Sequence, residues 1–464
     1  MTQPLSRLLA DHVISMPSAA IPAAAIHAAR RSLLDGLGVM LAASGMAAET
    51  FPFADLAAAS GGGSCTLLGG KGRASATEAA FANGALAHAM DFEDSFDIAP
   101  VHPNACLIPA LLAFAEESGP VSGTDFLAAM AVGCDLVCRL GLALRTDPTA
   151  FGWYPPPILG GFGAVAACAR VAGLSADQLI NAFSLLLCSS TCSAEIKYSP
   201  QSHIRAVRDA FPAEAAVRAV QLAARGVKGF DCPIEGKAGL FAMYARGEYD
   251  AAPLTERLGE RFHGEDLSFK PWPSCRGTHP FIGAVLALAE EHGFTAAQVA
   301  RIDLEGHPIL RMLSEPEASK RRPSTAIDAK FSLPFTVSAA LLDGGVTLDS
   351  FSAAALGRED IALMAQHVHV TIDENAPANA IVAGTTSLTL ADGRVLSRAM
   401  PQALGHPTMP MSDGDLAAKF RMCASRAARP LADEAADKLI AVLAILENHT
   451  DAARAITGAM ESPA

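Results

Sequence analysis

The spacing of apolar residues changes near residue 265, and this change constrains the fold more than any other feature of the chain. Before it, apolar residues recur every three or four positions, which is typical of helices that pack through one face. After it, Ile302 and Leu304 alternate with charged residues, and Val368 and Val370 alternate with polar ones, as in half-buried strands. We therefore predict a mainly α protein with a smaller α+β domain.

The individual elements follow from the same patterns. Residues 385–390 and 394–399 flank an Ala-Asp-Gly turn and are expected to form a hairpin. Ser122 and Ser175 precede apolar stretches and are expected to cap helices. The helices predicted upstream lie at about 22–44, 76–90, 104–118, 124–144, 158–173, 176–193 and 207–226, and those predicted downstream at about 278–293, 328–343, 357–365 and 413–453.

Three consecutive prolines, Pro155 to Pro157, interrupt an uncharged run between Asp147 and Arg170. The run is long enough to span a bilayer, but prolines break helices. We therefore predict a loop leading into a helix, and no membrane span. The N-terminus lacks a basic start followed by an apolar stretch, so no signal peptide is expected. Ten cysteines without a CxxC pair are expected to be mostly buried apolar residues of a cytoplasmic protein.

The charge balance argues against one class of partner. Lys and Arg number 35 and Asp and Glu number 48, which gives a net charge of −13. A chain this acidic is a poor ligand for phosphate backbones, so we expect no binding to nucleic acid. Apolar residues make up 51% and charged residues 18%. This composition provides a large core and indicates that some apolar surface is buried between subunits.

The densest set of titratable groups lies in segment 88–96, with His102 shortly after it. Asp91, Glu93 and Asp94 fall within four residues, directly after a predicted helix and therefore on a loop. The functional interpretation is a general acid/base site in which a carboxylate orients a histidine. An acidic turn that caps helices explains the same residues equally well. A metal site is only weakly indicated, because the spacing matches no known calcium loop.

Three further segments combine residue types that bind anions or transfer protons. A Trp-Tyr-Pro-Pro-Pro loop carries Tyr154. Arg205 and Arg208 are three apart, would share a helix face and would suit a carboxylate. A stiff loop and a solvated helix face are the simpler explanations of these two. The third segment is either a proline-stiffened linker or a site with a Cys–His pair, and it carries Lys270, Ser274, Cys275 and His279.

These segments, in this order, resemble the MmgE/PrpD family over nearly the whole chain. The resemblance rests on a His-x-x-Asp-Phe-acidic-Asp-Ser run with a downstream His-Pro, and on the stretches 32–39, 83–95, 270–279 and 329–335. It implies an all-helical domain at 1–265 that is completed by 411–464, and a smaller α+β domain at 266–410. It also implies a homodimer and chemistry without cofactor or metal on small carboxylates, in a cleft between the domains.

The resemblance also assigns site residues, position by position. His102 is expected to act as base or acid with Asp91 orienting it, and Arg205 and Lys270 are expected to bind carboxylates. The remaining matches are expected to contact the substrate: Ser95, Ser274, Cys275 and His279. Family members commonly carry a histidine at the position of Tyr154 and a lysine at that of Arg205. Arginine does not shuttle protons, so some proton-transfer groups are expected to have moved.

Three functions are compatible with these residues. The first is a cofactor-independent lyase, most of all a dehydratase that removes a proton alpha to a carboxylate of a small hydroxy-polycarboxylate. In that reaction Tyr154 would protonate or hydrogen-bond the leaving hydroxyl. The second is an epimerase of an amino- or imino-dicarboxylate, with His102 and Tyr154 on opposite faces of the carbon. The third is a non-catalytic dimeric protein that kept the fold.

Overall fold

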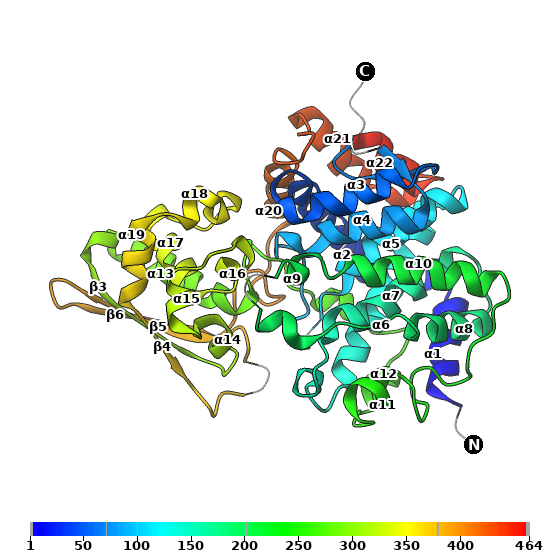
Figure 1. The fold of residues 1–464 in the computed structure, drawn as a ribbon, viewed down its shortest axis with the longest axis horizontal. Helices are drawn as coiled ribbons and strands as arrows, with labels where there is room; N and C mark the ends of the chain where they lie inside the picture. Colours follow the sequence, from blue (N-terminus) through cyan, green and yellow to red (C-terminus); the bar gives the residue numbers. More distant parts are fainter. Residues whose placement is uncertain (1–2, 71, 100, 200–201, 378–379, 461–464) are drawn as a thin grey trace.

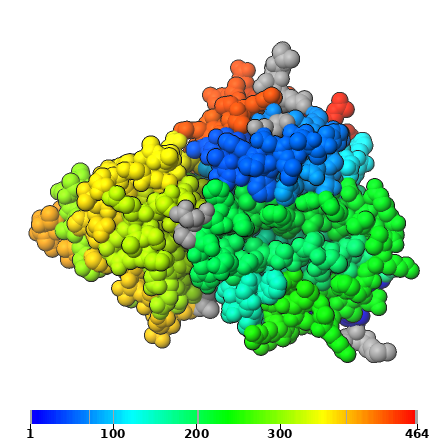
Figure 2. Space-filling model, in the orientation of Figure 1, coloured from blue at the N-terminus to red at the C-terminus, as the bar shows by residue number. Residues whose placement is uncertain are grey.

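The computed structural model describes residues 3–70, 72–99, 101–199, 202–377 and 380–460. A helical part forms most of the molecule, and a smaller part contains a mixed sheet with helices (Figure 1). The two parts pack against each other along a broad face (Figure 2). The prediction of a mainly α chain with a smaller α+β region is thereby confirmed.

The helical part is built around three apolar helices, α5 (Pro103–Ser118), α6 (Gly123–Ala143) and α7 (Pro155–Val171). α6 and α7 approach closely at two glycines: a Cβ on Gly133 would lie 2.6 Å from the carbonyl oxygen of Gly163. The surrounding helices are α1 (Leu5–Ser15), α2 (Ala23–Met46), α3 (Phe51–Ala59), α4 (Ala76–Ala89), α8 (Ala176–Leu187) and α10 (Ala210–Ala224). A short hairpin of β1 (Cys65–Leu67) and β2 (Gly72–Ala74) joins α3 to α4.

One of these helices has the dimensions of a membrane span. Within the described residues, α6 is long and apolar enough to cross a bilayer, as is the bent pair formed by 23–46 and 48–59 taken as one. The most apolar window of α6 is 94% buried inside the protein. Burial on all sides by neighbouring helices is the environment of a core helix.

The prediction of a loop across the three prolines is wrong, because α7 begins at Pro155. The prolines occupy its first turn, where backbone N–H groups have no intrahelical acceptor and where the fixed φ of proline favours the helix. Tyr154 is consequently the N-cap residue of α7. The predicted caps at Ser122 and Ser175 are confirmed, since each hydroxyl accepts a backbone N–H of its helix.

The sheet of the smaller part has the strand order β4-β3-β5-β6. β3 (Val299–Gly306) pairs in parallel with β4 (Val368–Ile372) and antiparallel with β5 (Gly384–Leu390), and the predicted hairpin joins β5 to β6 (Val395–Met400). The helix α13 (His279–His292) packs on β5 and β6, and α17 (Leu333–Asp343) packs on α13.

The chain returns to the helical part after the sheet. There α20 (Asp413–Ala424) packs on α2, and α21 (Asp433–Ala444) and α22 (Ala452–Met460) follow (Figure 1). Gly38 of α2 lies against the Phe420 ring. The Lys419 ammonium lies 2.6 Å from an Asp35 carboxylate oxygen. The helical part therefore contains segments from both ends of the chain.

Candidate active site

A cavity of about 530 Å³ lies between the helical part and the sheet-containing part. The helical part contributes the loop after α4, the N-terminus of α5 and the N-terminus of α7. The other side includes 307–312 and Phe331. Seven residues assigned from the sequence line the cavity together: Asp91, Ser95, His102, Tyr154, Arg205, Lys270 and Cys275. Ser274 and His279 are buried but do not line it.

The loop after α4 turns sharply at Asp91. Its φ of 46° lies in the left-handed region, which aspartate tolerates better than most residues. The turn follows the end of α4 at Ala89, as predicted. α5 begins at Pro103 with His102 at its N-cap position and without a side-chain cap hydrogen bond. The acidic residues of the loop therefore do not cap α5, and the alternative interpretation of them as helix caps is wrong for this helix.

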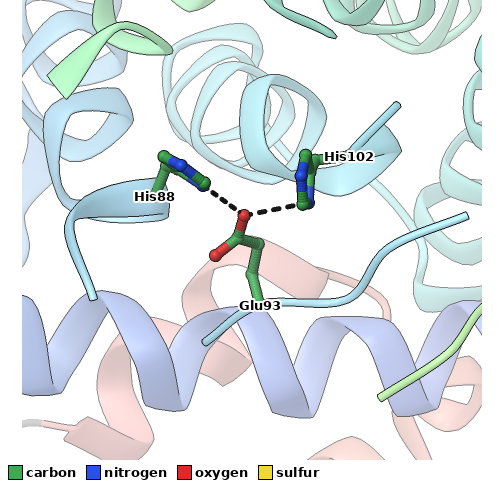
Figure 3. Close-up of side chains that lie close together, drawn as sticks. All are labelled: His88, Glu93 and His102. Carbon is green, nitrogen blue, oxygen red and sulfur yellow. Dashed lines mark hydrogen bonds and ion pairs between the residues drawn. The ribbon is translucent and has the colours of Figure 1, made fainter. Parts of the chain in front are cut away.

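Glu93 lies between two histidines (Figure 3). Its Oε1 atom is 2.5 Å from Nδ1 of His88 and 3.1 Å from Nδ1 of His102. The same His102 nitrogen is 3.0 Å from the backbone carbonyl oxygen of Asp94. Both neighbours of this nitrogen are acceptors, so it carries the proton. Neutral His102 therefore has its lone pair on Nε2, which has no hydrogen-bond partner among the described residues.

The protonation states of this cluster follow from burial and charge. Burial, reinforced by the charge of Arg208, lowers the pKa of His88 to about 4, so this imidazole is neutral near pH 7. Burial raises the pKa of Glu93, but His88, Lys270 and His102 together lower it well below its usual value. Glu93 is thus a fixed carboxylate behind His102, where it accepts the Nδ1–H and orients the ring.

Lys270 and Asp91 form a buried ion pair beside this cluster. The ammonium nitrogen lies 2.5 Å from Oδ1 of Asp91 and donates to its backbone carbonyl over 3.0 Å. Burial would raise the pKa of Asp91, but Lys270, His88 and His102 together outweigh it and lower that pKa to about 2. The carboxylate that contacts His102 is consequently Glu93, whereas Asp91 holds Lys270.

Arg205 and Tyr154 also line the cavity. The Arg205 guanidinium carbon is 3.5 Å from the centre of the Phe331 ring, and one of its nitrogens is 3.6 Å from the sulfur of Met312. No carboxylate pairs with it among the described residues. Arg208 lies 5.2 Å from the Tyr154 ring centre and pairs with Asp209 rather than facing the cavity.

The segment 270–279 does not form a Cys–His pair. Burial raises the pKa of Cys275 to about 11, so its thiol is protonated near pH 7. Nε2 of His279 lies 3.1 Å from the carbonyl oxygen of Ser274. The Ser274 hydroxyl is 2.8 Å from that of Thr278. The hydrogen bonds of Ser274, Thr278 and His279 therefore stabilise the segment that carries Lys270.

Sequence reasoning missed several residues of the site. His88 and Glu93 stand in the acidic run that was singled out, but the run alone does not show which acid faces a histidine. Arg276 lines the cavity and pairs at 2.7 Å with Asp97, to which the Ser95 hydroxyl also donates over 2.9 Å. Arg276 and Asp97 are 179 positions apart, so no local pattern links them. Lys197, the fifth residue missed, also lines the cavity.

One cluster of side chains offers the donor types that a metal ion binds. Among the described residues, the cluster with three ligand atoms within 4.8 Å of one another is that of His88, Glu93 and His102. Two nitrogens share one carboxylate oxygen, and the shorter distance is 2.5 Å. Ligands about 2.0–2.2 Å from a common ion lie about 3 Å or more apart. The arrangement fits hydrogen bonds rather than metal coordination.

Comparison with known proteins gives consistent matches. The MmgE/PrpD N-terminal domain matches residues 7–252, and the MmgE/PrpD C-terminal domain matches residues 272–445. Cis-aconitate decarboxylase from Homo sapiens is 27% identical over 380 residues, which cover 81% of this chain and 77% of that protein. A cis-aconitate decarboxylase-like protein from Aspergillus oryzae is 27% identical over 446 residues, or 90% of each chain. Cis-aconitate decarboxylase from Aspergillus terreus is 24% identical over 385 residues, covering 78% of this chain and 77% of that protein.

Proposed function

This chain belongs to the MmgE/PrpD family of lyases, and from that premise we propose that it dehydrates a small hydroxy-polycarboxylate without a cofactor. The observation that carries the proposal is the position of His102. Its Nδ1 is held by Glu93 and a backbone carbonyl, and the ring lines a cavity that also contains arginine and lysine side chains. Removal of a proton from the carbon next to a carboxylate requires a positioned base, and cations near that carboxylate to stabilise the charge that develops.

In this mechanism Nε2 of His102 takes the proton from the carbon alpha to a carboxylate. The imidazolium that forms is stabilised by Glu93, which stays ionised throughout. Arg205 binds a substrate carboxylate, because no side chain of the described residues neutralises its charge. Negative charge that develops on that carboxylate is stabilised by the same guanidinium. Tyr154 hydrogen-bonds the leaving hydroxyl.

The test is a screen of hydroxy-di- and tricarboxylates for an unsaturated product, followed by ultraviolet absorbance. His102→Gln keeps a polar side chain of similar size but removes the base, so kcat should fall roughly 10²- to 10⁴-fold. Tricarballylate, a tricarboxylate without a hydroxyl, should still raise the Tm of this variant. Turnover at the wild-type rate in His102→Gln would refute the base assignment. Failure to dehydrate any member of the panel would refute the proposed reaction.

Decarboxylation is a second candidate, because the relatives named above are cis-aconitate decarboxylases. Loss of CO2 leaves an electron pair next to the remaining carboxylates, and protonated His102 could supply the proton that the carbon then takes. CO2 release from cis-aconitate distinguishes this reaction from dehydration. Deuterium uptake from D2O into recovered substrate, without loss of water or CO2, would instead indicate an epimerase.

The proposal includes a cytoplasmic homodimer. Phe53, Phe81 and Phe211 form an aromatic cluster on α3, α4 and α10, with ring centres 4.9–6.3 Å apart. Phe211 is 50% exposed and nearby Leu56 on α3 is 61% exposed. Exposed apolar side chains of this kind are typical of subunit contacts. Light scattering tests the subunit number, and cell fractionation tests the location.

A further inference from the structure

The cations that line the cavity differ in whether their charge is already used. Lys270 is paired with Asp91, Arg276 with Asp97 and Arg145 with Asp250. Lys197 and Arg205 line the same cavity. Within the described part of the chain, neither has an ion-pair partner, and the Lys197 ammonium also makes no hydrogen bond. These two side chains are therefore the cations available to a substrate.

Only one of these two cations can transfer a proton. Arginine remains protonated in proteins, whereas a lysine gives up its proton when its surroundings disfavour the charged form. Burial lowers the pKa of half-buried Lys197, Asp147 raises it, and the charge of Arg205 lowers it further. Asp147 and Arg205 both line the cavity. Lys197 thus has one carboxylate and one guanidinium in its surroundings, which favour loss of its proton more than those of an exposed lysine do.

The local fold fixes Lys197 beside Tyr154. Lys197 is the last residue of a single 3-10 turn, η4 (Ala194–Lys197), which Ser193 caps. Two backbone hydrogen bonds fasten this turn to the loop before α7: the Tyr154 N–H donates to the Cys192 carbonyl over 2.8 Å, and the Ala194 N–H donates to the Gly152 carbonyl over 2.9 Å. The Tyr154 loop and the Lys197 turn therefore form one wall of the cavity.

Lys197 also stands where two cavities meet. A second cavity of about 1080 Å³ is lined by Lys197 and Arg205 on one side and by Ile309, Met312 and Phe331 on the other. All five residues also line the catalytic cavity. The Lys197 ammonium therefore faces both cavities, and this placement suits an anionic substrate.

We propose that Lys197 is a catalytic residue, the general acid of the elimination; this proposal rests on the dehydration proposed above. His102 removes the alpha proton, and the electron pair of that C–H bond forms the carbon–carbon double bond. The C–O bond breaks, and its electron pair takes a proton from the Lys197 ammonium, so that water leaves. The resulting amine and the His102 imidazolium then exchange protons with solvent, which restores both groups.

The variants Lys197→Met and Lys197→Arg test this role, with the exposed Lys228→Met as the matched control. Both Lys197 variants should lower kcat roughly 100-fold or more. Lys197→Arg should keep the Tm increase with tricarballylate, because the positive charge remains. In D2O, both variants should still exchange the alpha proton of the substrate, because His102 is intact. Lys228→Met should match wild type in each assay.

Wild-type turnover in either Lys197 variant, or loss of proton exchange together with turnover, would overturn the acid assignment. If wild type dehydrates nothing, the proposed reaction fails, and a second measurement still tests Lys197. Trace acetylation with acetic anhydride, read by mass spectrometry, should modify Lys197 at lower pH than Lys228, with protection by tricarballylate. Equal reactivity without protection would refute the role of Lys197 in anion binding and proton transfer.

Discussion

Asp94 should make the protein less stable as the pH rises from about 4 to about 7. The carboxyl group is buried, and one oxygen accepts a hydrogen bond from the Asn104 amide over 2.7 Å. Burial, reinforced by the nearby charge of Asp35, raises the pKa of Asp94 to about 7 from an ordinary value of 3.8. The folded protein therefore keeps a proton that the unfolded chain has already lost across this range.

The size of the effect follows from the two pKa values. A difference of roughly three units at 1.36 kcal/mol each corresponds to about 4 kcal/mol, of which about 2 kcal/mol falls between pH 5 and pH 7. Unfolding entropy of about 2.1 cal/mol/K per residue gives roughly 1 kcal/mol/K for a chain of 464 residues. Relative to wild type, Asp94→Asn should therefore gain about 2 °C in Tm between pH 5 and pH 7, with only a small further gain up to about pH 8.

Asp97→Asn is the matched control. Burial would raise the pKa of Asp97, but Arg276 lowers it to about 2, so its stabilisation is lost only as the pH falls from about 4 towards 2. The Tm difference between this variant and wild type should hence be constant from pH 5 to pH 8. Parallel Tm–pH curves for wild type and Asp94→Asn would refute the reasoning about Asp94.

Two further predictions concern packing and buried charge. Gly133→Ala should destabilise the folded protein by about 1–3 kcal/mol, because the added Cβ would lie 2.6 Å from the Gly163 carbonyl oxygen. Gly458→Ala, whose Cβ would have no atom within 4 Å, should instead stabilise it by about 0.5–1 kcal/mol. Thermal melting of both variants tests this, and equal shifts in Tm would contradict it. Arg139→Met should lower the free energy of unfolding by about 3–5 kcal/mol, because it removes the guanidinium that lies 2.6 Å from the buried Asp135 carboxylate and leaves that charge unpaired. The exposed Arg257→Met should change the free energy of unfolding by less than about 1 kcal/mol. Urea unfolding measures both, and an unchanged stability in Arg139→Met would contradict the account.

The sequence predicts those parts of the fold that depend on neighbouring residues. The helices at 22–44 and 104–118 and the hairpin strands at 385–390 and 394–399 lie within about two residues of α2, α5, β5 and β6. Contacts between residues that are far apart in the sequence cannot be predicted in this way. Nothing local shows that β4 adds in parallel to β3, because 61 residues separate the two strands. The helix predicted over 328–343 is interrupted at Ser332, whose hydroxyl caps α17.

The same distinction applies to the site. The acidic run after α4 and the downstream His102 were identifiable because they are close in sequence. The sequence does not show which carboxylate contacts His102. The left-handed turn at Asp91 directs the Asp91 carboxylate to Lys270, which lies 179 positions away in the sequence. Lys197 carries no motif of its own. Its importance appears only when the partners of every other cation in the cavity are known.

The charge of the cavity reconciles an acidic chain with an anionic substrate. The chain as a whole carries a net charge of −13. The cavity is lined by five Lys or Arg residues (Arg145, Lys197, Arg205, Lys270 and Arg276) and three Asp residues (Asp91, Asp97 and Asp147), which gives 5 − 3 = +2. The potential that a ligand meets in a cleft is set by these nearby groups more than by distant ones, which salt screens beyond about 10 Å. Because Asp91 and Asp97 are each bound to a cation of the wall, the positive charge left for the substrate is concentrated at Arg205 and Lys197, in the same cavity as His102.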